Sequence, residues 1–218
     1  MSVTHHAPNP SPSDERPSAL GRSSRLAQAL LPGVAVLFVG CSAMTAQNPS
    51  SALKPVNAVP DGSDERVMLK GADVTAYFTQ GRYVQGAPQF KSVFESVTFR
   101  FASAESKAVF DAAPQKYLPQ YGGYCANGVS FAIPWGGDAD TFKMIDGKLH
   151  IFGGQASRDA FELDVPGNIK LADKYWADEI AGSNSWVQRY KRMVLRVPHY
   201  KSGDELAKRV ADAKSKKN

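Results

Sequence analysis

The sequence predicts an α+β fold: a single small domain of antiparallel hairpins and short helices, followed by basic C-terminal helices. Three observations lead to this prediction. The Asp146–Gly147 pair lies between two alternating runs, which is typical of a two-residue hairpin turn. Ser103 precedes a helical stretch as an N-cap residue would. Strand-like and helical segments are mixed along the chain, which indicates α+β rather than a regular βαβ order.

The first 40 residues are typical of a signal peptide with a leader. Residues 1–20 are rich in Pro, Ser and His without apolar periodicity, which predicts disorder. Arg22 and Arg25 then precede an apolar run that ends at Gly40. This run has about 15 residues, fewer than the roughly 20 that span a bilayer as a helix. An uncleaved signal anchor and a misassigned start are the alternatives.

Cys41 is predicted to carry a lipid. The residues before it, Leu37-Phe38-Val39-Gly40, resemble a bacterial lipobox, although Phe38 replaces the usual leucine. Ser42 follows the cysteine, and by the same resemblance this favours an outer-membrane lipoprotein that faces the periplasm. With Cys41 acylated, Cys125 has no intrachain partner, so the chain is not a disulfide scaffold. Nucleic acid is excluded as a partner of such an exported chain.

Residues 41–65 are expected to form the lipid anchor and a polar tether, and residues 66–180 the domain. Its elements are predicted from local patterns. In chain order they are a strand or hairpin over Ser92–Phe101, a helix capped by Ser103 that reaches Phe110, a short helix from Pro114, a hairpin over Thr141–Phe152, and an amphipathic helix after Pro166 that carries Leu171, Tyr175 and Ile180.

Residues 181–218 are predicted to form a basic helical tail. Residues 187–218 hold ten basic and three acidic groups, a net charge of +7. Ser185-x-x-Gln188 and Ser202-x-x-Glu205 resemble capping boxes of two helices, separated at Pro198. In the second helix an apolar face of Leu206, Val210 and Ala213 lies among lysines and arginines. This helix could lie on anionic lipid headgroups or be solvated.

Several motifs in order resemble the exported branch of the YHS domain family, over about residues 66–180. They are Leu69–Phe78, Phe99–Phe110, Pro114–Cys125, Asp146–Leu149 and Asp164–Ile169. The resemblance implies a small treble-clef-like unit, which in metal-binding relatives carries Cys or His ligands at three places. This chain has Ala76, Ala102 and Ser106 there. Alanine has no donor atom and a serine hydroxyl suits soft metals poorly, so the family metal site is predicted to be lost.

Cys125 is the remaining candidate for chemistry, with Tyr121, Tyr124 and His150 as possible partners. Zinc would require four paired ligands, which the sequence lacks, whereas copper(I) needs fewer and softer ones. The Asp146–Gly147 turn pairs Lys143 with His150 and places His150 on the polar face of the hairpin, which predicts an exposed histidine. A glycine-rich turn with Cys125 packed as a small apolar residue is the structural alternative.

The sequence therefore predicts a lipid-anchored envelope protein with a YHS-like domain and favours a non-enzymatic role. Its ligand would be a soft metal ion, copper among the candidates, or a small molecule near Cys125. Two alternatives stay open. One is a thiol-dependent enzyme or redox protein that uses Cys125 with help from His150. The other is a structural adaptor that contacts the membrane through the basic tail.

Overall fold

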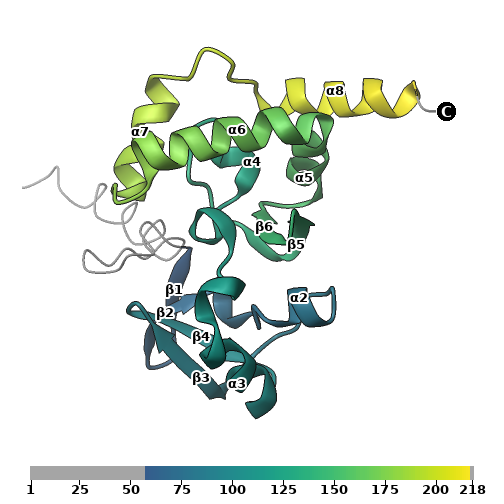
Figure 1. Ribbon diagram of the computed structural model, residues 1–218. Helices are drawn as coiled ribbons and strands as arrows, with labels where there is room; N and C mark the ends of the chain where they lie inside the picture. Colours follow the sequence, from purple (N-terminus) through teal and green to yellow (C-terminus); the bar gives the residue numbers. More distant parts are fainter. Residues whose placement is uncertain (1–56, 217–218) are drawn as a thin grey trace, which may run out of the picture.

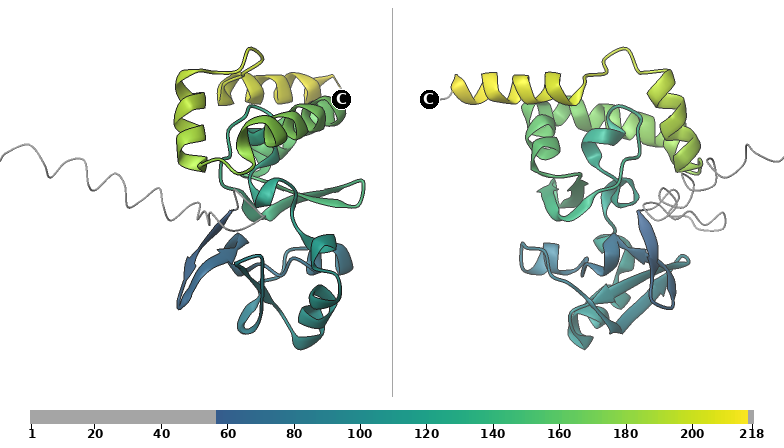
Figure 2. Two further views of the ribbon diagram at one scale, coloured as in Figure 1. Left: turned by 60° about the vertical axis from the view of Figure 1, so that its left-hand side comes forward. Right: turned by 180° about the vertical axis from the view of Figure 1, so that it is seen from behind.

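The computed structural model describes residues 57–216 of the 218-residue chain (Figure 1). The predicted α+β class is confirmed. A small β-sheet with one covering helix forms one part of the molecule, most of the helices form the other, and a two-stranded hairpin lies between them (Figures 1 and 2). The predicted signal peptide, Cys41 and the tether up to residue 56 lie outside the described residues.

The four-stranded sheet has the order β1-β2-β4-β3. Strand β1 (Ala58–Asp61) pairs antiparallel with β2 (Asp64–Met68), β2 runs parallel to β4 (Val97–Phe101), and β4 pairs antiparallel with β3 (Ala87–Phe94). The sequence boundary at residue 65 was therefore wrong. Residues 58–61, which have tether-like composition, gain their structure by pairing with β2, and a single-strand pattern cannot reveal that partner.

The β3–β4 hairpin and the helix after it confirm the local predictions. Glu95 and Ser96 link the strands with φ values of 47° and 63°, the left-handed conformation that two-residue hairpin turns require. Ser103 accepts a hydrogen bond from the Ser106 N–H and caps α3 (Ala104–Ala112). The short helix predicted from Pro114 is η2 (Pro114–Tyr117). Two further short helices, η1 (Leu69–Gly71) and α2 (Ala76–Thr79), lie between β2 and β3.

Two hydrophobic clusters make up the core. The first lies between the sheet, α3 and one face of the second hairpin, and it contains Ala58, Met68, Leu69, Ala72, Val74, Tyr77, Val97, Phe99, Phe101, Phe110, Tyr117, Leu149 and Ile151. The second lies among the helices and contains Tyr121, Tyr124, Ala126, Val129, Phe131, Ala132, Ile133, Phe152, Phe161, Ala172, Tyr175, Ile180 and Val197. Both clusters are built from residues between Ala58 and Val197.

The second hairpin joins the two clusters. Strands β5 (Asp138–Ile145) and β6 (Lys148–Phe152) have the register predicted from the Asp146–Gly147 turn, with Lys143 opposite His150. The predicted exposure of His150 was wrong, because its side chain is only 3% exposed. Strand β6 is covered on both faces, with Leu149 and Ile151 in the first cluster and Phe152 in the second. The prediction took one face of the hairpin to be solvated, whereas the helices cover that face.

The helical part begins with η3 (Gln120–Gly123) and α4 (Ala126–Val129), and continues after β6 with α5 (Gln155–Phe161) and η4 (Glu162–Asp164). The amphipathic helix predicted after Pro166 is α6 (Val165–Tyr175), extended by one π-helical turn, η5 (Trp176–Ile180). Asp164 caps α6 by accepting from the Gly167 N–H at 3.0 Å. Of the three apolar residues that the sequence placed on this helix, Tyr175 and Ile180 are buried and Leu171 is half-buried against the second cluster.

The basic tail folds as two helices, α7 (Ser185–Val194) and α8 (Gly203–Ser215), on either side of Pro198. The capping box at Ser202 and Glu205 is confirmed. The one predicted at Ser185 was wrong by a residue, because Asn184 accepts hydrogen bonds from the first helical N–H groups of α7. The tail is not a separate appendage, since α8 lies beside α5 and its Leu206 packs on the second cluster.

Candidate functional site

Cys125 lies at the start of α4 and is enclosed by the protein. Its thiol accepts a hydrogen bond from the Gly128 N–H at 3.5 Å, and its sulfur lies 3.0 Å from the Ser157 hydroxyl. The backbone N–H of Cys125 donates to the Trp135 carbonyl at 2.9 Å, and the residue is 3% exposed. These contacts make the thiol a packed helix cap, which agrees with the structural alternative weighed for it.

The glycines before Cys125 serve packing. Gly123 has a φ of +78°, and a Cβ added there would lie 3.0 Å from a methyl carbon of Leu69. Asn57 holds the same turn from the other side, because its backbone N–H donates to the Gly122 carbonyl and its side-chain amide to the Gly123 carbonyl. The Gly122–Gly123 turn therefore lets η3 approach the first core cluster closely.

Tyr121 and His150, both candidates from the sequence, meet at the seam between η3 and β6. Their ring centroids are 5.8 Å apart, and the Tyr121 hydroxyl donates to a carboxylate oxygen of Asp173 at 2.8 Å. His150 Nδ1 lies 3.1 Å from the Lys148 carbonyl, which can only accept, so Nδ1 carries the proton. Burial lowers the pKa of His150, and burial together with the Asp173 hydrogen bond raises that of Tyr121. Both side chains are therefore neutral near pH 7.

The four sequence candidates do not form one site. Within residues 57–216 no hydrogen bond joins the Cys125 thiol to His150, and the fully buried Tyr124 lies near Arg66 instead. In the same part of the chain no three His, Cys, Asp or Glu side chains come together in a way that could hold a metal ion. No such cluster therefore surrounds Cys125 in that part of the chain.

The relation between Tyr124 and Arg66 was missed by sequence reasoning. Arg66 lies on β2, more than fifty residues earlier in the chain, and no motif connects the two positions. Arg66 stands between the acidic pair Asp64–Glu65 and the apolar pair Val67–Met68, so nothing in the sequence marks it as buried.

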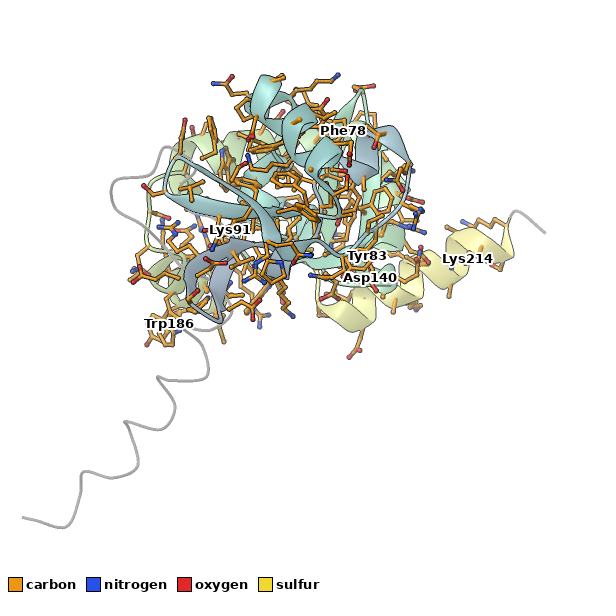
Figure 3. All side chains as sticks on the ribbon, turned by 90° about the horizontal axis from the view of Figure 1, so that it is seen from below. Phe78, Tyr83, Lys91, Asp140, Trp186 and Lys214 are labelled. Atoms are coloured by element: carbon orange, nitrogen blue, oxygen red, sulfur yellow. The ribbon has the colours of Figure 1, made fainter. Side chains whose placement is uncertain are left out.

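A shallow polar pocket of about 350 Å³ lies where η1 meets the start of β5. Its polar side chains are those of Lys70, Tyr83, Gln85, Asp138 and Asp140. Figure 3 shows Tyr83 and Asp140 next to one another at this edge of the molecule. Gln85 is committed to the backbone, because its amide donates to the Lys70 and Gly71 carbonyls. Carboxylates of this pocket face water, so no buried group selects a ligand.

Helix α7 has an unusual polarity, because its polar face is turned inward. Gln188 and Arg189 are buried and donate to the carbonyls of Ala132 and Pro134. Arg192 forms a two-pronged ion pair with Glu179 of η5, to which Gln188 also donates at 3.1 Å. Polar contacts thus attach α7 to the domain.

The apolar side chains of α7 face solvent. Val187, Tyr190, Met193 and Val194 lie at helical spacings on one side, and each is about 60% exposed, as is Leu195 at the helix end. Trp186, 40% exposed, begins the same surface, and Figure 3 shows it at the periphery of the molecule. We call these residues, 186, 187, 190 and 193–195, the α7 apolar face. Exposed apolar surfaces of this kind are typical of protein or membrane contact sites.

The sequence predicted that α8 could be the helix of the tail that faces lipid, but the structure shows that the apolar sides of α7 and α8 have different surroundings. Leu206 of α8 packs on the second cluster, and Lys214 pairs with Asp159 of α5 at 2.7 Å. The apolar side of α8 is thus turned toward the protein, whereas that of α7 is open. Among residues 57–216, no helix has both the length and the apolar character needed to cross a membrane.

Comparisons with protein-family models, curated proteins and solved structures find no match to this chain.

Proposed function

We propose that this chain is a lipid-anchored protein of the cell envelope, similar to the exported YHS domain family, whose domain lies on an anionic membrane surface. The role is non-enzymatic, and the α7 apolar face makes the contact. The single observation that supports the proposal most is the inverted polarity of α7. A helix that binds its own domain through polar groups leaves its apolar surface free to enter the apolar part of a membrane.

The chemistry of the face suits the headgroup region of a bilayer. Trp186 and Tyr190 are residue types that concentrate at membrane interfaces, where an apolar ring and a polar group can both be accommodated. Arg196, just after the helix, is exposed beside the apolar residues, and Lys191 on the helix is exposed although it pairs with Glu179. Each basic group near an anionic surface contributes about 1 kcal/mol to binding.

The proposed anchor keeps this face within reach of the bilayer. Fifteen residues, 42–56, separate Cys41 from the first described residue, and an extended chain of that length spans roughly 50 Å. Tethering raises the effective concentration of the membrane at α7, so a weak contact is sufficient. A second copy of this chain is a poorer occupant, because pairing two α7 faces would bring two basic tails of like charge together.

The test is binding of the unlipidated chain, residues 42–218, to vesicles. This chain keeps every residue of both core clusters, and a single cooperative thermal transition verifies that it is folded. We expect co-flotation with phosphatidylglycerol-containing vesicles and little with pure phosphatidylcholine. Raising the salt concentration should weaken binding, because it screens the basic groups.

Val187→Ser combined with Val194→Ser should weaken vesicle binding about 30-fold. Each valine side chain is nearly two-thirds exposed, and inserting that exposed surface into the membrane contributes about 1 kcal/mol to the free energy of binding. Removing both valines therefore costs about 2 kcal/mol of binding free energy. Val93→Ser is the matched control, because Val93 is 69% exposed on β3, far from α7, and its loss should leave binding unchanged. Equal binding by the double variant would contradict the proposal. A concentration-dependent dimer without vesicle binding would assign the face to a second copy instead.

A further inference from the structure

Arg66 is a buried cation for which the described part of the chain offers no hydrogen-bond partner. Its side chain projects from β2, the residue is 9% exposed, and none of the three guanidinium nitrogens has a hydrogen-bond partner within residues 57–216. Arg66 differs in this from two other buried arginines of the described chain, each of which has at least one acceptor for its guanidinium, although the Arg100 Nε also has no partner. Arg100 on the neighbouring β4 pairs with Asp61 and Asp64, and Arg189 donates to the Pro134 carbonyl.

An unpaired guanidinium in such a place is costly. It carries five N–H donors in a fixed plane and keeps its charge at any physiological pH. Burying a charge without a counter-charge costs several kcal/mol, and for this reason buried arginines are normally paired. Burial lowers the pKa of Arg66, with the nearby Tyr124 phenol acting in the opposite direction. A partner outside the described protein atoms would remove the penalty.

The surroundings of Arg66 place it at the seam between the two parts of the molecule. Residues two apart in a strand share a face, so Arg66 lies on the same side of β2 as Met68. A Cβ added to Gly123 would lie 3.3 Å from the Met68 sulfur, so this side of the strand faces the η3 turn. Tyr124, fully buried directly after that turn, brings its phenol close to Arg66.

We propose that Arg66 binds a small oxyanion, a carboxylate or a phosphate, at this seam beside Tyr124. The planar guanidinium donates two parallel N–H bonds to such a group, which neither chloride nor a neutral ligand accepts in the same way. This site is distinct from the α7 apolar face and does not depend on the membrane proposal. It gives the domain a ligand chemistry that requires neither a metal nor the Cys125 thiol.

The test is titration of the folded chain, residues 42–218, with sodium acetate, sodium phosphate and sodium chloride at matched ionic strength. We expect a saturable rise in Tm of a few degrees with acetate, phosphate or both, and a single site by calorimetry, since a ligand that binds only the native state stabilises it. Acetate alone would identify a carboxylate ligand, and phosphate alone a phosphate group. No saturable binding of either anion would overturn the proposal.

Arg66→Leu should abolish the anion-dependent rise in Tm. In chloride alone its Tm should equal or exceed that of the wild type, because the substitution removes an unpaired buried charge. Arg82→Leu is the matched control: it makes the same change in net charge at an exposed position and should keep the anion response. An unchanged response in Arg66→Leu would overturn the proposal. Should Arg66→Leu not fold, Arg66→Lys serves instead, with weakened anion binding expected because lysine cannot form the planar pair.

Discussion

Replacing Glu179 by alanine tests whether polar contacts hold α7 on the domain. The Glu179 carboxylate lies on η5 and accepts from three side chains of α7: Gln188 at 3.1 Å, Lys191 at 2.9 Å, and both prongs of Arg192. In the alanine variant these donors lose their common acceptor. The inward face of α7 then keeps its hydrogen bonds to the carbonyls of Ala132 and Pro134.

The expected magnitude follows from the exposure of each partner. Glu179 and Arg192 are only 16% and 15% exposed, so their charge-assisted bonds are worth about 2 kcal/mol after allowance for solvent. Lys191 is 46% exposed and its pair contributes less than about 1 kcal/mol. We therefore expect a loss of about 2–3 kcal/mol in the free energy that keeps α7 docked. This corresponds to an equilibrium constant for the opening of α7 that is about 30- to 150-fold larger.

Native-state hydrogen exchange of the α7 amides measures this directly. Their protection should fall by the stated factor in Glu179→Ala, while the amides of β4 keep theirs. Asp178→Ala is the matched control, because the neighbouring Asp178 pairs with the exposed Lys174, and its loss should change protection by less than about twofold. Equal protection of α7 in wild type and Glu179→Ala would refute the reasoning.

The same ion pair predicts a pH dependence. Burial of Glu179 would raise its pKa, but hydrogen bonds from Lys191, Gln188 and Arg192 outweigh burial, and the pKa is lowered. A carboxyl with a lowered pKa in the folded state stabilises it above its unfolded pKa near 4.5, and this contribution is lost as the pH falls through the folded value. Protection of α7 in the wild type should therefore decline below about pH 4.5, and Glu179→Gln should remove that decline.

Three further results are expected. Leu149→Ala should lower the free energy of unfolding by about 2–5 kcal/mol in denaturant titrations, because Leu149 is fully buried, whereas Leu195→Ala at an exposed position should cost under about 0.5 kcal/mol. The pKa of His150 is lowered by burial, so unfolding takes up a proton below about pH 6.5; stability should fall as the pH drops from that value, and His150→Gln should flatten the profile. Alkylation of Cys125 in the native chain should be at least about 100-fold slower than in denaturant, since the thiol is 3% exposed; comparable rates would show that the thiol is accessible.

Local signals in the sequence were sufficient for most individual elements. The Asp146–Gly147 turn determined the register of β5 and β6, Ser103 and Ser202 determined two helix starts, and Pro198 separated the last two helices. These features depend on residues within a few positions of one another, so their physics is contained in a short window. The Ser185 cap failed within such a window, because Asn184, one position earlier, is the better acceptor for the free N–H groups.

The candidate site was less predictable, because it depends on contacts between distant segments. Tyr121 and His150 were named from the sequence, and their rings do lie in contact. They meet because both faces of β6, which carries His150, are buried, and the sequence pattern did not predict this. The Cys125 thiol caps α4 locally, but its contact with the Ser157 hydroxyl joins residues more than thirty positions apart. No window of sequence contains both partners of such contacts.

The sequence by itself determined the α+β class, the hairpins and the amphipathic character of the tail helices. Only the tertiary structure decided which faces of these elements are covered. Helix α7 shows why: its periodicity separates apolar from polar residues, but Glu179 and the Pro134 carbonyl attract the polar side inward. A sequence pattern defines the two faces of a helix. Which face is buried depends on the free energy gained when that face contacts the rest of the protein instead of water. For the same reason the sequence contained Arg66, and only the fold showed that it is buried with no hydrogen-bond partner among residues 57–216.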